Sequence, residues 1–433
     1  MTNARDHHTP LTTDPPVATS PTRETPGAYR VLTMATLGFT LMFAAWMMFG
    51  VLGIPIQEEF GLTDVQLSLI SSVAILNGSL WRLPAGIIAD RLGGRIVMTV
   101  LLVASAVFSY MVSLADSYSM LLGLAFAVGL AGNSFSVGNT WVAAWFSKRR
   151  NGLAMGVFGA GNVGASVTKF IGPVIIAATA GSLYFGGLVE GGWRLVPVIY
   201  AVALLATAVM LWFITPAQDK KPGQGRKLSE MLAPLKQGRV WRFSLYYVAV
   251  FGAYVALSSW MPKYYIDMYG VSTSTAALLT ALFIFPASLM RPVGGSLSDR
   301  FGARQTTIFA LLIMLTASGI LALPLTINIV LFTLLLFTLG VGMGIGKASV
   351  FKYIPDYFPG NVGSVGGLVG MFGGLGGAFL PPLFAGVKTA TGLEQATFLV
   401  IFVLVAFCLA WLLRAISLMK RTSPDPLWRR FGI

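Results

Sequence analysis

The chain has 433 residues, of which 55% are hydrophobic and only 11% are charged. A soluble protein of this length would carry about a quarter charged residues, so the composition excludes an ordinary soluble domain and favours a polytopic membrane protein. The single cysteine, Cys408, excludes a disulfide framework and a thiolate metal cluster. His7 and His8 lie near the N-terminus, where a solvated role is expected, so neither a metal nor a cofactor is predicted.

Residues 1–28 are rich in Pro and Thr, and we expect a disordered cytoplasmic tail without a cleaved signal peptide. Twelve apolar segments follow, each close to the length that spans a bilayer. Their approximate ranges are 30–53, 67–89, 96–115, 118–146, 152–180, 193–214, 241–266, 275–298, 305–323, 327–357, 361–388 and 395–418. The polar break between the sixth and seventh segments predicts four parts, which are an N-terminal six-helix half at 29–214, a cytoplasmic linker at 215–240, a C-terminal six-helix half at 241–418 and a cytoplasmic tail at 419–433.

Basic residues gather in alternate loops, in the linker and in the C-terminal tail, whereas the other loops carry only three basic residues and seven acids. Because basic loops stay on the cytoplasmic side, this asymmetry predicts a multi-pass protein of the inner membrane with both termini in the cytoplasm. It also explains the net charge of +14, so nucleic-acid binding is a remote interpretation. A monomer in the lipid bilayer is the default expectation.

One stretch occurs twice. Residues 81–95 read WRLPAGIIADRLGGR and residues 290–304 read MRPVGGSLSDRFGAR, so that Arg82 matches Arg291. An arginine near the middle of a bilayer costs at least a few kcal/mol, so it is rarely kept without a function. Two related arginines therefore suggest one site built from both halves of the chain, which is the arrangement expected of a transporter with its site near the midplane.

The repeated charged turn resembles the loop motif that joins helices 2 and 3 and helices 8 and 9 of the major facilitator superfamily. This resemblance implies an all-α membrane protein with twelve transmembrane helices in two pseudo-symmetric six-helix halves. We expect the charged residues of both copies to lock the cytoplasmic ends through charge pairs when the site faces outward. These residues are Asp90, Arg91, Arg95, Asp299, Arg300 and Arg304.

Two glycine-rich stretches, GVFGAGNVGASV on helix 5 and GLVGMFGGLGGAFLPP on helix 11, resemble the paired signatures of the nitrate/nitrite porter family. Close helix packing is the simpler explanation for most of these glycines, because small residues let membrane helices approach each other. The signature glycines are Gly156, Gly159, Gly161, Gly164, Gly367, Gly370, Gly373, Gly374 and Gly377. Asn162 lies inside the first stretch, and its amide could donate to a bound anion.

A planar guanidinium can hold two oxygens of nitrate at once, so we assign Arg82 and Arg291 to a site that brackets this ion. Apart from Asp356 at the end of the tenth segment, no Asp or Glu falls within an apolar segment, which weakens the alternative that the arginines pair with acids. By resemblance to the family, Phe135 and Phe251 sandwich the ion and Tyr247 lies near it. Asn139 follows Phe135 by four residues and completes the candidate set, although packing remains an alternative role for each aromatic residue.

Lys169 and Lys347 also fall inside apolar segments and are candidates for proton coupling, because a buried lysine can release its proton whereas arginine cannot. Their alternative role is a static hydrogen bond between helices. Lys352 lies nearer the end of its segment and is expected to extend toward the interface. The family resemblance is closer to the branch assigned to proton-coupled uptake, because exchangers carry uncharged amides at the positions of Lys169 and Lys347.

We therefore expect a secondary transporter that imports nitrate with protons by alternating access. A nitrate/nitrite antiporter is the second reading, since exchange needs no titratable group. An exchanger of small carboxylates such as formate or oxalate and a non-transporting nutrient sensor are less favoured. An enzyme is not expected, because the segments contain no pair of nucleophile and base and no cofactor motif.

Overall fold

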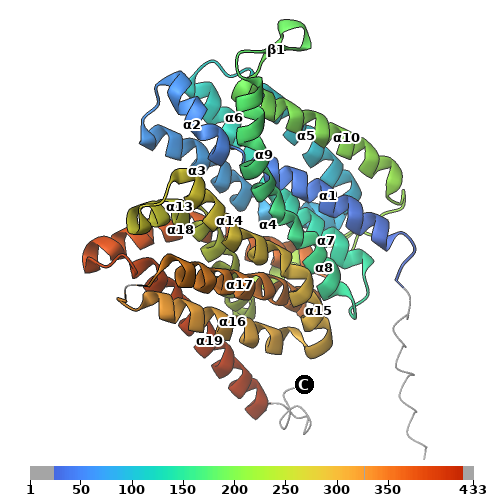
Figure 1. The fold of residues 1–433 in the computed structure, drawn as a ribbon. Helices are drawn as coiled ribbons and strands as arrows, with labels where there is room; N and C mark the ends of the chain where they lie inside the picture. The colour runs from blue at the N-terminus through green and yellow to red at the C-terminus, as the bar shows by residue number, and fades with distance from the viewer. Residues whose placement is uncertain (1–23, 326, 423–433) are drawn as a thin grey trace, which may run out of the picture.

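The structure is a computed structural model and describes residues 24–325 and 327–422. Residues 1–23 of the tail predicted at 1–28, which include His7 and His8, lie outside the described residues. Residues 423–433 of the tail predicted at 419–433 also lie outside them. The described chain is almost entirely helical, with one two-stranded antiparallel sheet, β1 (Leu183–Tyr184) and β2 (Val189–Glu190). The sequence did not predict this small hairpin, which joins two long helices of the first half (Figure 1).

The first half contains ten α-helices. They are α1 (Ala28–Trp46), α2 (Phe49–Phe60), α3 (Asp64–Leu80), α4 (Arg82–Leu92), α5 (Gly94–Ser113), α6 (Tyr118–Val128), α7 (Ser134–Trp145), α8 (Asn151–Gly159), α9 (Gly164–Thr179) and α10 (Leu195–Ile214). Short 3-10 turns lie between or beside them: η1 (Gly129–Asn133), η2 (Ala160–Val163), η3 (Phe185–Gly187) and η4 (Gly192–Arg194).

The second half follows a short helix, α11 (Leu228–Leu232), and a 3-10 turn, η5 (Ala233–Lys236). Its helices are α12 (Gly238–Tyr247), α13 (Ala253–Tyr269), α14 (Thr273–Leu289), α15 (Arg291–Phe301), α16 (Ala303–Ala322), α17 (Ile329–Tyr357), α18 (Val362–Thr391) and α19 (Ala396–Thr422). A π-helical segment, η6 (Val248–Gly252), connects α12 to α13.

Within the described residues, eleven helices or helix runs are long and apolar enough to cross a membrane. The pair Leu69–Leu80 and Arg82–Leu92 forms a twelfth span if its two pieces, which are bent by 41°, count as one. The twelve-helix fold expected from the sequence is therefore confirmed. Because lipid offers no hydrogen-bond partners, each span keeps its backbone groups paired within the helix.

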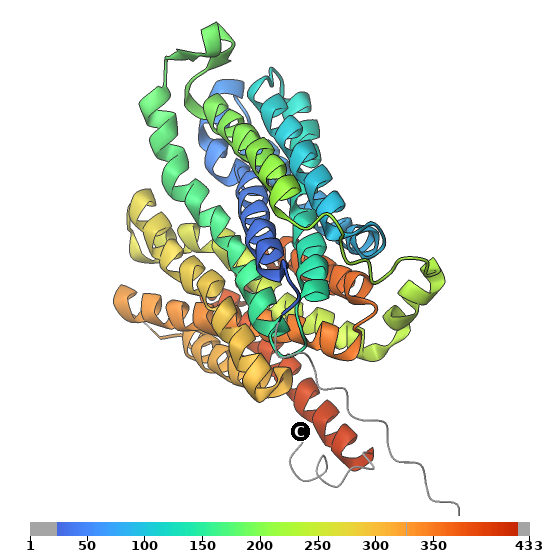
Figure 2. The same cartoon turned by 90° about the vertical axis from the view of Figure 1, so that its right-hand side faces the viewer.

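The two halves pack side by side, with the blue-to-green helices of the first half next to the yellow-to-red helices of the second (Figures 1 and 2). The start of α1 and the end of α19 lie at the same end of the bundle (Figure 2). The loops at this end carry Arg91, Arg95 and the run Lys148 to Arg150 from the first half. We call it the basic end.

The repeated turn is held at the basic end by matching glycines. Gly93 follows α4 with a φ of 93° and Gly302 follows α15 with a φ of 88°. Side chains rarely adopt this left-handed backbone, and a glycine permits it without strain. Each glycine therefore lets the chain reverse directly into the next span, which fixes where the charged residues before it lie.

Several helices are interrupted at the middle of the bundle. The span containing α3 and α4 breaks at Trp81, and the span containing α14 and α15 breaks at Met290. Arg82 and Arg291 are each the first residue after the break. The spans of α8 and α9 and of α12 and α13 also change to 3-10 or π geometry at this level. Such local irregularities often mark functional positions in helices.

The glycine-rich helices cross the other half at these same breaks. A Cβ atom on Gly156 would lie 2.4 Å from the backbone oxygen of Arg291, and one on Gly367 would lie 2.7 Å from that of Arg82. Both distances are shorter than a van der Waals contact, so only glycine allows the helices to approach this closely. The paired glycine stretches thus position each arginine of one half against a helix of the other.

Candidate functional site

Arg82 and Arg291 are both completely buried at the centre of the bundle. No carboxylate among the described residues lies within ion-pair distance of either guanidinium. Their charge is therefore not neutralised by the protein, as the sequence suggested. Burying two like charges without acids is unfavourable, which makes this region suited to an anion.

Arg82 is partly held by backbone carbonyls. Its Nε donates to the Gly78 oxygen at 2.8 Å, and its Nη1 donates to the Gly370 oxygen at 2.9 Å. The second bond joins α4 of the first half to α18 of the second half. Only Nη2 has no hydrogen-bond partner. Arg82 therefore ties the two halves together and still presents one nitrogen to a ligand.

Arg291 is held differently. Its Nε and Nη1 atoms are buried without a hydrogen-bond partner. The guanidinium lies against Gly159, where an added Cβ would come within 2.3 Å of both Cζ and Nε. Two donor nitrogens of this planar guanidinium are therefore available to the oxygens of a bound anion.

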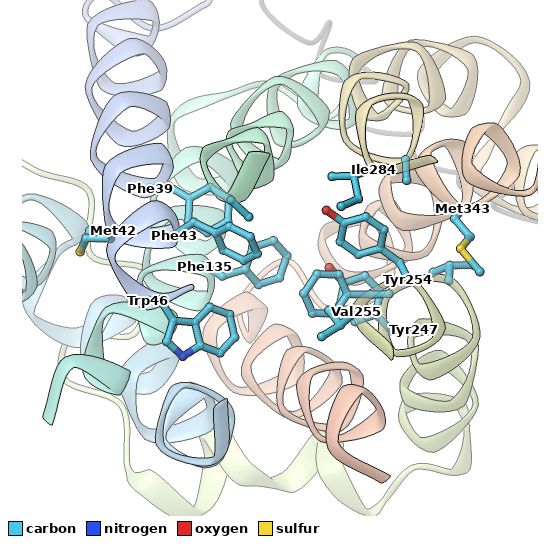
Figure 3. Close-up of a cluster of buried hydrophobic side chains, with 14 of the residues drawn as sticks. Phe39, Met42, Phe43, Trp46, Phe135, Tyr247, Tyr254, Val255, Ile284 and Met343 are labelled. Atoms are coloured by element: carbon cyan, nitrogen blue, oxygen red, sulfur yellow. The ribbon is translucent and has the colours of Figure 1, made fainter. Parts of the chain in front are cut away.

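Aromatic rings surround the arginines. The Cζ atoms of Arg82 and Arg291 lie 5.3 Å and 5.2 Å from the centroid of the same Phe135 ring, and Arg82 Cζ lies 5.5 Å from that of Phe251. Both arginines are thus within the range of a cation–π interaction with Phe135. Figure 3 shows Phe135 facing Tyr247 across the boundary between the two halves.

The rings of Phe135 and Phe251 are almost parallel, with an interplanar angle of 4° and centroids 6.1 Å apart. Tyr247 stacks on Phe251 at 5.1 Å and also lies nearly parallel to Phe135. A planar ion between two ring faces needs about 7 Å, because each contact takes about 3.5 Å. The phenylalanines must therefore separate by about 1 Å or more before an ion lies between their faces.

Asn162 is fully buried, and neither atom of its amide has a hydrogen-bond partner. It lies in the 3-10 turn η2, three residues after Gly159, and residues at this spacing lie on the same face of a 3-10 helix. Since Gly159 faces the guanidinium of Arg291, Asn162 lies one turn further along the same face. Its unpaired amide is consistent with the predicted role.

Two other candidate residues have different surroundings. The Oη atom of Tyr247 is buried without a hydrogen-bond partner, beside the ring cluster. Asn139 instead donates its amide to the Phe135 oxygen at 3.0 Å, within its own helix. Asn139 therefore supports the position of Phe135, and the structure shows no contact between its side chain and either arginine.

The two lysines differ in burial. Lys347 is completely buried, donates to the Ala287 oxygen at 2.9 Å, and has its Nζ atom 3.1 Å from the ring centroid of Tyr254. Its Nζ also lies 5.7 Å from the ring centroid of Phe251, which places it next to the aromatic cluster. Lys169 is half-buried on α9. Lys347 is therefore the lysine that the structure brings close to the arginines.

At the basic end, each repeated aspartate binds the start of the glycine-rich helix of the other half. Asp90 accepts from the Gly363 nitrogen of α18 at 2.9 Å. Asp299 accepts from the nitrogens of Gly152 and Leu153 of α8 at 2.9 Å and 2.7 Å. A carboxylate at a helix N-terminus pairs free N–H groups and interacts favourably with the helix dipole. These contacts join the two halves at the basic end.

The repeated arginines make other contacts than the charge pairs we expected. Arg91 donates to the Arg226 oxygen of the linker, and Arg95 donates to the oxygens of Trp212 and Ala217. Arg304 donates to the Tyr357 hydroxyl, and Arg300 lies over the Phe301 ring. The motif arginines therefore bind backbone oxygens and aromatic residues. Among the described residues, none of them forms a direct ion pair with Asp90 or Asp299.

Lys352 corrects one expectation. It does not extend to the membrane interface, because its side chain is only 5% exposed and lies 3.1 Å from Asp299 and 3.2 Å from Asp356. It also donates to the Lys148 oxygen of the first half. Sequence reasoning treated Lys352 as a single charge and missed Asp356, which follows it by four residues in the same helix. Nothing in the sequence indicated that Asp299 of α15 also lies beside it.

The sequence also missed two aromatic residues near the site. The ring of Trp46 lies 5.4 Å from Arg82 Cζ, and that of Phe351 lies edge-on to Phe135 with centroids 5.0 Å apart. Trp46 donates its indole N–H to the Ala74 oxygen, which fixes its orientation. A tryptophan within an apolar segment signals such an acceptor, but no spacing in the sequence connects it to Arg82.

Comparison with known proteins identifies the family. The model of the Major Facilitator Superfamily matches residues 34–381 and 267–430. A probable nitrate/nitrite antiporter, NarK1 of Thermus thermophilus, is 60% identical over 419 residues, which cover 93% of this chain and 95% of the relative. A nitrite extrusion protein of Bacillus subtilis is 32% identical over 83% of this chain and 88% of the relative. A probable nitrate transporter, NarT of Staphylococcus epidermidis, is 32% identical over 90% and 96%.

Solved structures share the fold at low identity. The fucose transporter FucP in an outward conformation matches with a TM-score of 0.69 and 18% identity, over 89% of this chain and 98% of its own. The human organic anion transporter MFSD10 matches with a TM-score of 0.73 and 17% identity, over 90% and 100%. The motifs, the fold and these relatives agree, and the chain belongs to the nitrate/nitrite porter family of the Major Facilitator Superfamily.

Proposed function

We propose that the protein is a secondary transporter that carries nitrate, with nitrite as a related substrate, into the cell by alternating access. The observation that carries this proposal is the set of three buried and unpaired guanidinium nitrogens, Nη2 of Arg82 and Nε and Nη1 of Arg291. They belong to different halves and surround one phenylalanine ring. A planar monoanion with several acceptor oxygens satisfies these donors and compensates their charge. The relatives named for nitrate and nitrite support this choice of anion.

The basic end faces the cytoplasm in this proposal, because loops rich in Lys and Arg remain on that side. Asp90 and Asp299 bind helices of the opposite half at this end and the arginines are completely buried, so in this proposal the described conformation is closed to the cytoplasm. Rocking of the two halves breaks these contacts and opens the site to the cytoplasm. Release of the anion leaves the site empty, and net uptake then requires the empty protein to return and bind a new ion on the other side.

We further propose that protons drive uptake. Inward movement of one negative charge against a negative-inside potential costs about 2.3 kcal/mol per 100 mV, so more than one proton must accompany each nitrate for net inward drive. Lys347 is the preferred coupling group because it is buried beside the aromatic cluster and has no carboxylate partner among the described residues. Its bond to the Ala287 oxygen requires it to be a donor, which either protonation state of an amine can supply.

Nitrate/nitrite exchange is the second candidate, favoured by the antiporter name of the relative from Thermus thermophilus. Exchange moves one anion each way, so it needs no proton and no titratable group. Small-carboxylate exchange and nutrient sensing lack a comparable observation, and competition of formate with labelled nitrate tests the former. No covalent chemistry is proposed for the site, and the protein acts as a monomer.

Flux in proteoliposomes with pH and voltage set independently tests the coupling. Proton symport predicts that acid outside accelerates nitrate entry, and that Lys347→Gln lowers this acceleration on the order of tenfold while nitrate counterflow persists. Lys169→Gln tests the second candidate lysine, which is less buried than Lys347, and a smaller loss of this acceleration is expected there. Exchange is indicated instead if the pH gradient has no effect and internal nitrite alone drives entry.

A further inference from the structure

Two backbone oxygens, those of Gly78 and Ala287, lie at matching places in the two halves. Each belongs to the third residue from the end of its helix, α3 or α14, and the arginine of the same half follows four residues later. The last carbonyls of a helix have no N–H partner within that helix. Because the spans break before Arg82 and Arg291, both oxygens are available to a side-chain donor.

The two oxygens accept from different side chains. The Gly78 oxygen accepts from Nε of Arg82 at 2.8 Å. The Ala287 oxygen accepts instead from Nζ of Lys347 at 2.9 Å. Nε of Arg291 is buried without a hydrogen-bond partner. In the second half, a lysine of α17 thus occupies the oxygen that the arginine itself binds in the first half.

The matching position in the first half cannot hold a side chain like that of Lys347. The offset that relates Arg82 to Arg291 places Gly138 of α7 at this position. A Cβ atom on Gly138 would lie 2.2 Å from the ring of Phe158, so the space is already filled. The difference in hydrogen bonding between the two arginines therefore follows from a lysine that only the second half has room for.

Lys347 is held firmly at the Ala287 oxygen. Its side chain is completely buried, and Nζ lies 3.1 Å from the ring centroid of Tyr254, in a cation–π contact. Within residues 24–325 and 327–422, no carboxylate is at ion-pair distance from Lys347, and the Ala287 oxygen is its only hydrogen-bond acceptor. The dipole of α14 also favours a cation at this end of the helix.

We propose that Lys347 is a positioning residue for Arg291, because it occupies the oxygen to which Nε of Arg291 would otherwise bind. Arg82 shows that an arginine at this place reaches the carbonyl four residues earlier. A carbonyl oxygen has two lone pairs, but repulsion between the two cations opposes a second bond from Arg291. Nε of Arg291 therefore stays available to the anion.

This inference rests on the proposed function, in which Arg291 binds nitrate. It adds that Lys347 acts on the ion through Arg291 and not by contact with it. The candidate coupling group is thereby connected to the anion site by one backbone oxygen. Without a donor at residue 347, Arg291 is expected to bind the Ala287 oxygen and to offer one nitrogen fewer to nitrate.

Isothermal titration of the purified full-length protein with nitrate tests the inference. Lys347→Met is similar in size but has no donor, so nitrate should bind about tenfold more weakly. Lys347→Gln keeps a donor for the Ala287 oxygen without the charge, and its Kd should rise by less than about threefold. A thermal melt of each variant shows whether it is folded.

Two backgrounds separate positioning from a general effect of charge. In Arg291→Lys the planar group that could turn to the Ala287 oxygen is absent, so adding Lys347→Met should not weaken nitrate binding further. In Arg82→Lys, the matched control, Lys347→Met should still weaken binding about tenfold, because Arg82 does not compete for this oxygen.

The outcomes distinguish this inference from the proposed function. Equal losses from Lys347→Met in the two backgrounds would mean that Lys347 acts by its charge alone, and would overturn the inference. An unchanged Kd in Lys347→Met, or a loss in Lys347→Gln as large as in Lys347→Met, would also overturn it. Absence of nitrate binding to the unchanged protein would reject the proposed function itself, and the inference with it.

Discussion

Arg82 and Arg291 occupy matching places in two related halves, but the protein holds them differently. Arg82 has two of its nitrogens bound to the Gly78 and Gly370 oxygens, whereas Arg291 has two nitrogens without a partner. Sequence symmetry thus conceals an asymmetry of hydrogen bonding. In the proposed function, Arg82 both ties the halves together and offers one nitrogen to the ligand, whereas Arg291 offers two.

The repeated aspartates also differ in how firmly they are held, but here the residue of the second half has more partners. Asp90 bonds to one nitrogen of α18 through one oxygen, and its other oxygen is buried without a partner. Asp299 uses both oxygens on α8 and also forms an ion pair with Lys352. The first half therefore contributes the more firmly held arginine, and the second half contributes the more firmly held aspartate. Changes at matching positions should then have unequal effects.

The largest expected effect is on nitrate affinity at Arg291. Arg291→Lys replaces the fork of donors by a single ammonium, which costs about 3 kcal/mol, or roughly 100-fold in Kd. Arg82→Lys also weakens binding, but in addition it loses the bond to Gly370 and should lower the Tm. Isothermal titration with nitrate and a thermal melt of each variant measure the two effects.

The melting temperatures show whether a variant loses nitrate affinity because it is less stable or because the arginine itself is missing. We expect Arg291→Lys to melt close to the unchanged protein, because its Nε and Nη1 atoms have no hydrogen-bond partner within the protein. If both variants lose affinity equally and melt at the same temperature, the two arginines are equivalent. The difference in their hydrogen bonding would then have no functional consequence.

The sequence predicted the symmetric features of the molecule well. The repeated arginines, the paired glycine stretches and the twelve spans could be found because each depends on spacing within a segment or on a repeat. The glycine turn after α4 recurs after α15 for the same reason. These features depend on local backbone geometry and on composition, which one sequence records directly.

The asymmetric features could not be predicted. Whether Arg82 binds the Gly370 oxygen depends on how α4 crosses α18. The sequence gives no indication of this crossing, because both halves carry an arginine at the matching position. The ion pair of Lys352 with Asp299 likewise depends on contact between α17 and α15. The helix breaks at Trp81 and Met290 also went unforeseen, because the apolar pattern continues through them.

A smaller effect is expected when a methyl group is placed beneath each arginine. A Cβ on Gly159 would lie 2.3 Å from the Arg291 Cζ, whereas the nearest atom to a Cβ on Gly370 is the Arg82 Cδ at 3.4 Å. Gly159→Ala therefore displaces the guanidinium and should weaken nitrate binding by about tenfold, at an overpacking cost of about 1 kcal/mol or more. Gly370→Ala should change affinity little.

Gly386→Ala in α18 is the control, since a Cβ at that position meets no atom within 4 Å. Titration with nitrate measures all three variants. Because the displaced group is the flexible end of a side chain, Gly159→Ala should retain a Tm near that of the unchanged protein. Equal loss of affinity in Gly159→Ala and Gly370→Ala would contradict the view that the guanidinium of Arg291 is the more sensitive of the two.

The smallest effects concern the basic end, where Asp299→Asn and Asp90→Asn weaken the contacts that close it. Asp90→Asn removes the charge at one helix N-terminus, worth about 1 kcal/mol, so the open population rises severalfold. Asp299→Asn also leaves Lys352 with Asp356 as its only carboxylate partner among the described residues, so its effect should be larger. Alkylation of Val362→Cys in a Cys408→Ser background reports opening, because Val362 is 7% exposed in the closed form.

Asp267→Asn provides the control, since its partner Lys263 lies in the same helix at the opposite end of the bundle. It should leave the alkylation rate unchanged. Faster labelling in Asp90→Asn than in Asp299→Asn would contradict the view that the ion pair between Lys352 and Asp299 stabilises the closed form. The bond from Lys352 to the Lys148 oxygen of the first half would then be enough to hold the basic end closed.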